Sequence, residues 1–324
     1  MKVLLIGLGR WGEKHLRVLG ELGCELWVAD RSPERRAFAV KAGVPEARAV
    51  ADFRAALPHV DVVDLVTPAD SHLALASECL RAGKDCFVEK PLTLTVAEGR
   101  ALADVVRSTK RVLQVGHIFR FHPVTQLMRE RIRSRTMGAV RYGTGRFAGF
   151  KRPRTDVGAT QTDGIHYFDL FAYLLQENPT AVTATLRDFL GRGMDDVGFC
   201  TVEYGRVPAF VEVGYFAPGT YRDCVIVGEQ ETLAGDFGTA EVKVLANRHV
   251  KEGGAWNAPD GAGETLKASG PEPLSQELTL FLDACVRRTA PAVDVEAGLL
   301  ALKVVEAAHR SSELGRRVEL RELG

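Results

Sequence analysis

Short apolar runs alternate with longer amphipathic segments over the first 120 residues. The apolar runs are residues 1–6, 25–29, 62–66, 86–88 and 112–115, and helix-forming segments lie between them at 13–22, 70–81 and 96–108. Strands that alternate with helical segments are typical of a parallel sheet with helices on both faces. This part of the chain therefore predicts an α/β, doubly wound parallel sheet.

Beyond residue 120 the pattern changes to β-rich segments separated by glycine and proline turns, at 137–150, 182–189, 199–204, 209–216, 224–227 and 242–246. Such a series favours an antiparallel sheet. Residues 251–273, rich in Gly, Ala and Pro, are predicted to form a loop, and apolar residues at helical spacing predict helices over 275–288 and 295–312. We therefore expect two domains, residues 1–120 and 121–324, with the C-terminal helices packing back.

Composition suits a two-domain enzyme, because 324 residues with 46% hydrophobic content can fill two cores. The 42 basic and 42 acidic residues give no general attraction to nucleic acid. No apolar run is long enough for a membrane helix, and the chain enters a strand too early for a secretory signal, so we expect a cytoplasmic protein. Six scattered cysteines without CxxC spacing indicate neither a metal site nor a disulfide framework.

The first apolar run leads directly into a glycine-rich turn. Gly7, Gly9 and Gly12 form the pattern GxGxxG, with Arg10 and Trp11 before the last glycine. Between a strand and a helix, these glycines allow a tight turn, a close approach of the backbone to a pyrophosphate, and close packing of the helix on its strand. Since the amino end of that helix then faces the phosphates, the turn predicts a dinucleotide site.

Asp30 ends the second apolar run and bears on the choice of cofactor. An acidic side chain at this point can accept hydrogen bonds from both ribose hydroxyls of NAD. Arg31, Ser32 and Arg35 follow it and could hold the 2′-phosphate of NADP, which Asp30 would repel. The sequence therefore favours NAD and leaves NADP open.

The third apolar run ends at Thr67 and Pro68, and His72 follows five residues after Thr67. If the sheet is wound as predicted, this turn lies on the same edge as Gly7, and a cofactor contact is expected there. The alternative is a structural turn in which Asp70 or Ser71 caps the next helix.

The tripeptide Glu89, Lys90 and Pro91 ends the fourth apolar run. Pro91 lacks an amide hydrogen and fixes its own φ, so the strand must stop there, and it pushes Lys90 toward extended backbone. Ligands of open α/β sheets gather beyond the carboxyl ends of the strands, which makes Lys90 a candidate for chemistry. The alternative is an ordinary solvated lysine.

Taken together, these motifs resemble the Gfo/Idh/MocA oxidoreductases, named for glucose-fructose oxidoreductase and inositol dehydrogenase. The likeness rests on the GxGxxG turn, the turn at residues 67–72 and the tripeptide at residues 89–91, and it extends over nearly the whole chain. Further matches lie at residues 114–123 and 164–169 and in a late helix that carries Gly298 and Ser311. Residues 114–123 are most similar to the subgroup that oxidises nucleotide-linked amino sugars.

The resemblance implies a Rossmann domain followed by an α+β domain with a large, open, mostly antiparallel sheet, NAD or NADP as cofactor, and a homodimer or homotetramer formed through the second sheet. Members mostly oxidise or reduce a hydroxyl or ketone on sugars, cyclitols and related small molecules. Cofactor contacts would come from the GxGxxG turn, Thr67, Pro68, His72, Glu89 and Lys90. The alternatives are an NAD-dependent glycosidase or lyase with transient oxidation, and a non-catalytic cofactor-binding regulator.

His166 is the candidate proton acceptor, and Lys90 is expected to polarise the substrate oxygen. Asp163, His166 and Asp169 stand three residues apart and would share one side of a helix. The near-neutral pKa of histidine suits a general base, although a buried structural histidine is the alternative. Family members commonly carry an aspartate four residues earlier; here that position is Thr162, so either Thr162 or Asp163 could take its role.

Three arginines complete the expected substrate site. Arg152 and Arg154 lie in a basic loop before this helix, and Arg120 lies in the family-like segment 114–123. Basic loops are usually solvated, but over a cleft this one would suit a carboxylate or diphosphate through bidentate contacts.

Overall fold

The computed structural model describes residues 1–259 and 261–324 and divides them into two compact units. Unit 1 comprises Met1–Ile118 and Glu272–Leu302, and unit 2 comprises Phe119–Pro271 and Lys303–Gly324. The chain first passes from unit 1 to unit 2 between Ile118 and Phe119, close to the boundary expected at residue 120. Residues 272–302 are the part of the expected second domain that clusters with unit 1.

Unit 1 contains a parallel sheet, its helices and several short helical turns. Its elements are β1 (Lys2–Ile6), α1 (Gly12–Glu21), β2 (Glu25–Ala29), α2 (Pro33–Lys41), η1 (Glu46–Arg48), β3 (Ala49–Val50), η2 (Phe53–Ala55), η3 (Leu57–His59), β4 (Val62–Leu65), η4 (Ala69–Ser71), α3 (His72–Arg81), β5 (Asp85–Glu89), α4 (Val96–Thr109), β6 (Leu113–Gly116), α7 (Pro273–Arg287) and the first turns of α8 (Val295–Leu314). The turn η5 (Ile118–Phe121) leads out of the unit.

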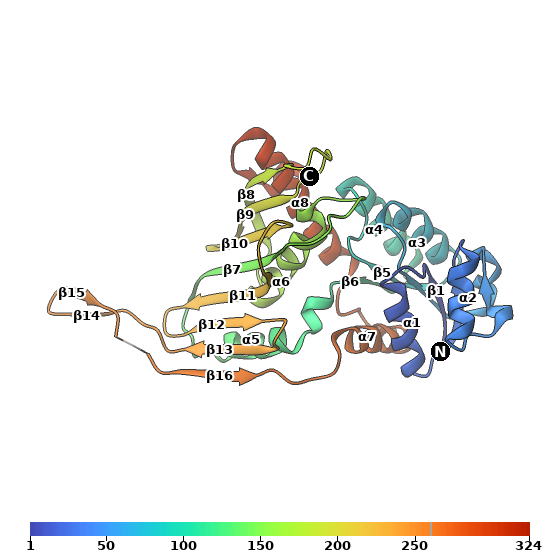
Figure 1. Cartoon of the computed structure of the whole chain (residues 1–324), viewed down its shortest axis with the longest axis horizontal. Coiled ribbons are helices and arrows are strands. Elements are labelled where there is room, and N and C mark those ends of the chain that lie inside the picture. Colours follow the sequence, from blue (N-terminus) through green and yellow to red (C-terminus); the bar gives the residue numbers. More distant parts are fainter. Residues whose placement is uncertain (260) are drawn as a thin grey trace. The chain divides into compact units, whose positions relative to one another are not determined.

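The six strands of unit 1 lie in the order β3-β2-β1-β4-β5-β6, and all neighbours are parallel (Figure 1). This confirms the predicted doubly wound sheet. The order reverses between β1 and β4, and ligands of such sheets bind in the crevice beyond the strand ends at this point. The turns that follow β1 and β4 carry the glycine motif and Thr67.

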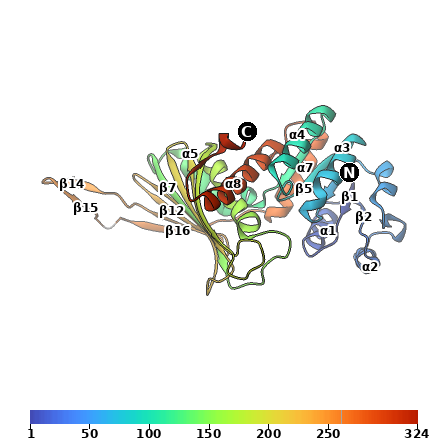
Figure 2. The same ribbon diagram turned by 90° about the horizontal axis from the view of Figure 1, so that it is seen from above.

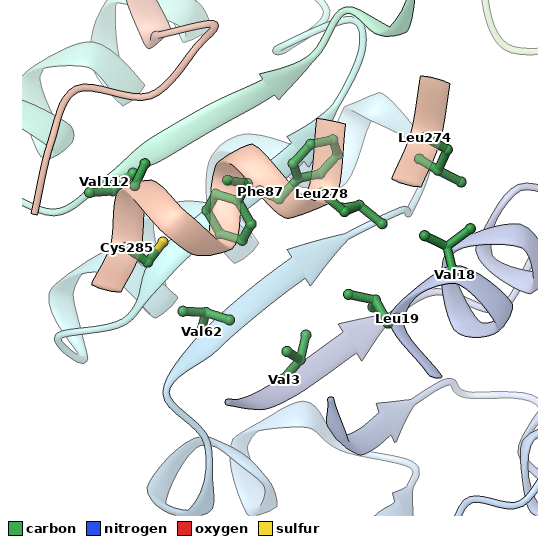
Figure 3. Close-up of a cluster of buried hydrophobic side chains, with 11 residues drawn as sticks. Val3, Val18, Leu19, Val62, Phe87, Val112, Leu274, Leu278 and Cys285 are labelled. Atoms are coloured by element: carbon green, nitrogen blue, oxygen red, sulfur yellow. The ribbon is translucent and has the colours of Figure 1, made fainter. Parts of the chain in front are cut away.

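One face of the sheet in unit 1 is buried under α1 and α7. Figure 3 shows Val3, Val62 and Phe87 of three neighbouring strands directed toward Leu19 of α1 and Leu278 of α7. The opposite face is covered by α3, α4 and the start of α8, where the side chain of Val115 lies close to Gly298 and that of Leu299 lies close to Gly99. With both faces covered, the strands are mostly apolar, although buried carboxylates such as that of Asp64 in β4 interrupt them.

Unit 2 is built around a large sheet. Its elements are α5 (Pro123–Ser134), β7 (Val140–Gly149), η6 (Thr160–Gly164), α6 (Ile165–Leu175), β8 (Pro179–Arg187), β9 (Val197–Tyr204), β10 (Val207–Gly214), β11 (Thr220–Gly228), β12 (Thr232–Asp236), β13 (Glu241–Leu245), β14 (Val250–Glu252), β15 (Ala255–Asn257), β16 (Gly263–Lys267), the end of α8, β17 (Val318–Glu319) and η7 (Leu320–Leu323).

The nine strands of this sheet lie in the order β16-β13-β12-β11-β7-β10-β9-β8-β17. The neighbours β7 and β10 are parallel, and the other neighbours are antiparallel. This confirms the predicted large, mostly antiparallel sheet. The loop predicted over residues 251–273 is wrong in part, because this stretch forms β15 and β16, and β14 and β15 make a hairpin beyond the end of the sheet (Figure 1).

Helix α6 packs tightly on β7, and two glycines make this possible. A Cβ atom at Gly145 would lie 2.3 Å from the Tyr167 ring, and one at Gly143 would lie 2.5 Å from the Phe171 ring. Both rings belong to α6, and Figure 2 shows helices on one side of this curved sheet. The close approach fixes the position of α6 and therefore of His166.

Several features bear on the expectations from composition. All six cysteines are free thiols, and five of them are buried. Within residues 1–259 and 261–324, no group of three or more His, Cys, Asp or Glu side chains could hold a metal ion. Over the same residues, no helix has both the length and the apolar character needed to cross a membrane.

Candidate active site

A groove of about 800 Å³ runs along the carboxyl ends of the strands in unit 1. Its lining includes Gly7, Gly9, Asp30, Thr67 and Pro68, all of which the sequence places in the cofactor site. The groove lies where the strand order reverses, so its position follows from the sheet topology.

The glycine turn has the shape that a pyrophosphate needs. Gly7 has φ of +95°, and a Cβ atom there would lie 2.7 Å from the carbonyl oxygen of Val66. A Cβ atom at Gly12 would lie 2.1 Å from the carbonyl oxygen of Gly7, whereas one at Gly9 would meet no atom within 4 Å. Gly7 and Gly12 therefore permit the turn, and Gly9 keeps space open beside the backbone.

The amino end of α1 also fits a phosphate. Helix α4 begins with a capping box formed by Thr95 and Glu98, but no side chain caps the start of α1 at Trp11. Backbone N–H groups at an uncapped helix start are donors for an anion, and the helix dipole favours negative charge there. The residues present thus fit a dinucleotide.

Asp30 anchors the glycine turn through both of its carboxylate oxygens. Oδ2 accepts a hydrogen bond from the Leu8 amide at 2.8 Å, and Oδ1 accepts one from the Ser32 amide at 2.9 Å. Arg35, a candidate for the 2′-phosphate of NADP, instead donates to the Leu8 carbonyl oxygen and to Glu13. Arg31 is exposed. Asp30 thus lines the groove, while Arg35 is engaged elsewhere.

His72 joins the turns that follow β4 and β5. Its ring nitrogens lie 2.9 Å from the carbonyl oxygen of Thr67 and 3.0 Å from that of Pro91. The ring is buried, and burial lowers the pKa of His72 despite the two carbonyl partners. The caps considered for Asp70 and Ser71 do not form, because no side chain caps the start of α3. The predicted cofactor contact of His72 stays a prediction.

A buried network of charged side chains lies behind Lys90. Trp11 Nε1 donates to Glu89 Oε1 at 2.7 Å, and His15 lies between two carboxylates, with Nε2 3.2 Å from Glu89 Oε1 and Nδ1 2.8 Å from Asp64 Oδ2. The backbone N–H of Lys90 donates to Glu89 Oε2 at 3.1 Å. Glu89 thus connects the glycine turn to the residue expected to act in chemistry.

Charge in this network is balanced by the histidine. Burial alone would lower the pKa of His15, but the Asp64 and Glu89 carboxylates raise it to about 10. Burial opposes ionisation of Glu89, yet its bonds to His15 and Trp11 bring its pKa below the usual value. Burial raises the pKa of Asp64. His15 is therefore a cation at neutral pH, and it holds Glu89 in its ionised form.

In unit 2, a π-helical turn leads into α6 and carries Thr162 and Asp163. The turn is Thr160–Gly164, and its hydrogen bonds span five residues instead of four. The rotation between successive residues of an α-helix therefore does not describe this segment. Both Thr162 and Asp163 are buried, and the structure leaves both open for the role of the family's aspartate.

His166 is the second residue of α6 and lies inside an aromatic cluster. Its ring stacks on Phe119 with 4.8 Å between ring centres and lies 5.7 Å from the ring of Phe147. Phe119 in turn stacks on Phe237 at 4.6 Å. The cluster orients the imidazole and leaves it largely shielded, with 7% of the residue exposed.

Two ion pairs hold the same end of unit 2 together. Lys151 Nζ lies 2.7 Å from Asp163 Oδ2. Arg120 donates two hydrogen bonds to the Asp169 carboxylate, one of them from Nε to Oδ2 at 2.8 Å. Lys151 belongs to the basic loop that also carries Arg152 and Arg154. Its contact with Asp163 ties that loop to the start of the helix that carries His166.

The remaining predicted arginines lie at the surface. Arg154 pairs with Asp156, and Arg152 is exposed.

Sequence reasoning missed Tyr215, whose burial raises its pKa to about 12, and Arg222, whose guanidinium lies over the Phe147 ring. The alternation along β11 could have revealed Arg222, since Cys224 and Ile226 point to the buried face and Arg222 shares their parity. The strand was predicted to begin too late, at residue 224.

Comparison with known protein families matches both parts of the chain. Residues 1–117 match a model described as "Oxidoreductase family, NAD-binding Rossmann fold", and residues 125–234 match the "GFO/IDH/MocA C-terminal domain". The first of these descriptions agrees with the groove and the glycine turn in unit 1.

Two of the curated relatives are dehydrogenases by name. The chain is 34% identical over 185 residues to UDP-N-acetylglucosamine 3-dehydrogenase of Acidithiobacillus ferrooxidans, an alignment that covers 57% of each chain. It is 28% identical over 329 residues to inositol 2-dehydrogenase of Rhizobium meliloti, covering 98% of each. Among solved structures, that of the A. ferrooxidans enzyme superposes with a TM-score of 0.85 at 24% identity, covering 97% of this chain and 98% of the other, which shows a common fold.

Proposed function

Because this chain belongs to the Gfo/Idh/MocA family of NAD-binding oxidoreductases, we propose that it is a dehydrogenase acting on a CH–OH group of a sugar, cyclitol or nucleotide-linked sugar. The observation that carries the proposal is the placement of Lys90 in unit 1. It follows β5 at the carboxyl edge of the sheet and is joined through Glu89 to the glycine turn.

NAD, when bound, accepts or returns the hydride, which is the difficult part of the chemistry. Gly7, Gly9, Gly12 and the start of α1 would hold its pyrophosphate, and Asp30 would accept from its adenosine ribose. The engagement of Arg35 by Glu13 and Leu8 supports NAD over NADP. The cofactor contacts of Arg10, Arg31, Thr67 and Pro68 are part of this proposal.

Lys90 would donate a hydrogen bond to the substrate oxygen and stabilise negative charge that develops on it. Glu89 would keep the Lys90 backbone in place through its carboxylate. The expected contribution of one such donor is roughly 100- to 1,000-fold in kcat.

His166 would take the proton of the substrate hydroxyl as general base. Its stacking on Phe119 supports this role because the stack limits the orientations of the ring. Asp163, held by Lys151, and Thr162 precede it, and one of them would orient the histidine or the substrate. Arg120, Arg152 and Arg154 remain proposed substrate contacts.

The relatives support a sugar-like substrate. One acts on UDP-N-acetylglucosamine and another on inositol, as their names state, so hydroxyls of six-membered rings are the common feature. We propose the same substrate class for this chain. Membership of the nucleotide-sugar subgroup is the narrower form of the proposal.

We also propose a cytoplasmic homo-oligomer, dimer or tetramer, formed through the large sheet. The face away from α6 carries Tyr142, Phe199 and Phe210, of which Phe199 is 55% exposed. Exposed aromatic side chains on a broad sheet suit a self-complementary contact between two copies. The free thiols of all six cysteines are compatible with a reducing compartment.

The test replaces Lys90 with Met and measures turnover and NAD binding separately. A matched control is Lys41→Met, which removes an exposed lysine from the last turn of α2. Sugars, cyclitols and UDP-sugars are supplied with NAD, and NADH absorbance is followed. We expect Lys90→Met to lower kcat by roughly 100-fold or more, a much larger factor than the change in NAD affinity. Near-normal turnover would contradict the role of Lys90, and turnover without accumulation of NADH would favour the transient-oxidation chemistry.

A further inference from the structure

Arg222 is a half-buried cation on the face of the unit 2 sheet that α6 covers. It lies on β11 opposite Phe147 of β7, and its guanidinium carbon lies 3.4 Å from the centre of the Phe147 ring. The ring of Phe147 is also 5.7 Å from that of His166. Arg222 therefore belongs to the surroundings of the proposed general base.

The hydrogen bonds of Arg222 use only one edge of its guanidinium. Nη1 donates to the carbonyl oxygen of Tyr221 at 2.6 Å and to that of Ala148 at 3.4 Å. Within residues 1–259 and 261–324, no carboxylate pairs with Arg222, and its Nε and Nη2 donate no hydrogen bond to the protein. The unused edge has the planar fork that matches a carboxylate or phosphate.

Four other cations of unit 2 form ion pairs with carboxylates of the protein. Lys151 pairs with Asp163, Arg120 with Asp169, Arg154 with Asp156 and Arg192 with Asp196. Asp163, the carboxylate whose charge reaches Arg222, is already engaged by Lys151. Arg222 thus lies near several paired cations without a carboxylate partner of its own among the residues that the structure describes.

Burial makes the positive charge of the Arg222 guanidinium energetically unfavourable. Loss of solvent lowers the pKa of Arg222 from its ordinary value, even though the charge of Asp163 opposes the change. A guanidinium that stacks on an aromatic ring is attracted by the face of the ring. The ring offers no hydrogen-bond acceptor for the N–H groups along the edge of the guanidinium. An anion placed at that edge would satisfy both the charge and the donors.

We propose that Arg222 binds an anionic group of the substrate, a carboxylate or a phosphate carried by the sugar that is oxidised. This inference rests on the proposed dehydrogenase function and narrows its substrate class to anionic sugars. The two distances from the Phe147 ring limit the separation between the Arg222 guanidinium carbon and the His166 ring centre to about 9 Å. A six-membered sugar ring with one charged substituent can span such a separation.

The experiment compares matched neutral and anionic ligands on four proteins: wild type, Arg222→Met, Arg222→Lys and the control Arg206→Met. Arg206 is exposed in the turn between β9 and β10. Glucose is paired with glucuronate, and N-acetylglucosamine with UDP-N-acetylglucosamine, so that one pair tests a carboxylate and the other a phosphate. Binding is measured by calorimetry with NAD present, and NADH formation is measured separately.

We expect the wild type to bind the anionic member of one pair at least tenfold more tightly than its neutral partner. Arg222→Met should weaken that binding by about 10- to 100-fold and leave the neutral ligand within about twofold, as expected for loss of a charge-assisted hydrogen bond. Arg222→Lys should retain part of the affinity because it keeps the charge but not the fork. Arg206→Met should bind like the wild type.

Equal affinity for both members of each pair, or equal weakening of both by Arg222→Met, would overturn the anion site and assign Arg222 a packing role beside Phe147. NADH formation without an anion preference would leave the dehydrogenase proposal intact while removing this one. Conversely, anion binding that depends on Arg222 but yields no NADH from any ligand would support the site and count against the proposed function.

Discussion

Replacement of His15 tests whether the buried charges behind Lys90 are held by one protonated histidine. His15 is fully buried between Asp64 and Glu89. We consider His15→Gln, which keeps a polar side chain of similar length but cannot carry a positive charge. The variant would leave two carboxylates buried without their cation.

The size of the effect follows from two independent arguments. Removal of one partner from a buried ion pair typically costs about 3–5 kcal/mol, because the other charge remains without compensation. The rise in the pKa of His15 from 6.5 to about 10 corresponds to at most about 5 kcal/mol of preference for the charged form. The raised pKa of Asp64 offsets part of this, so we expect a loss of about 3 kcal/mol.

The pH dependence has a definite sign. The folded-state pKa of His15 lies above its unfolded value, so its contribution is complete below pH 6.5 and is lost as the pH rises through about 10. The stability difference between wild type and His15→Gln should therefore be largest at about pH 6.5, the acidic end of the range measured, and should shrink toward pH 10. The pH range of this change is determined by the pKa values of His15 in the unfolded and folded states.

Urea denaturation from pH 6.5 to 10, followed by fluorescence, measures this difference. The control is Arg17→Ala on the same helix, since Arg17 makes only exposed pairs with Glu21 and Glu272, and such pairs contribute at most about 1 kcal/mol. A loss below about 1 kcal/mol for His15→Gln, or a difference that does not change over this pH range, would refute the assignment of a buried imidazolium.

Three further predictions concern the site. Asp30→Ala removes the acceptor of the Leu8 amide, so calorimetry should show weaker NAD binding and a smaller preference over NADP; an unchanged preference would contradict its role. His166→Asn should lower kcat by roughly 100- to 10,000-fold with unchanged NAD affinity, and a small decrease would favour a structural histidine. Gly145→Ala should cost about 1–3 kcal/mol in urea denaturation, since its Cβ would meet the Tyr167 ring, and wild-type stability would show that α6 can move away from β7.

The parallel sheet and its cofactor edge could be predicted because local rules determine them. Buried parallel strands are continuously apolar, the glycines at 7, 9 and 12 report a turn that needs them, and Pro91 ends β5 whatever the tertiary context. The positions of Asp30 and Lys90 at strand ends follow from the same pattern. The strands and the turns between them could be predicted where their conformation depends on neighbours in the chain.

The contacts around His166 could not be predicted in this way. Lys151 meets Asp163 across twelve residues, and Arg222 reaches Phe147 from a different strand, so both depend on which strands become neighbours. The π-helical turn before α6 also changes the relation between Asp163 and His166 that helical spacing suggested. The extra strands β15 and β16 lie in a stretch whose glycines and prolines indicated only a loop.

Glu89, at the end of β5, connects the glycine turn to the backbone of Lys90 through its hydrogen bonds. A buried carboxylate without a cation would be costly, and His15 supplies the cation from α1, the helix that the glycine turn begins. Any movement of that turn would therefore disturb the hydrogen bonds of Trp11 and His15 to Glu89 and, through it, the backbone of Lys90. The proposed cofactor binding at the turn and the placement of Lys90 are thus linked through one buried side chain. His15→Gln should therefore weaken NAD binding and lower kcat together, whereas Lys90→Met should lower kcat by a much larger factor than it weakens NAD binding.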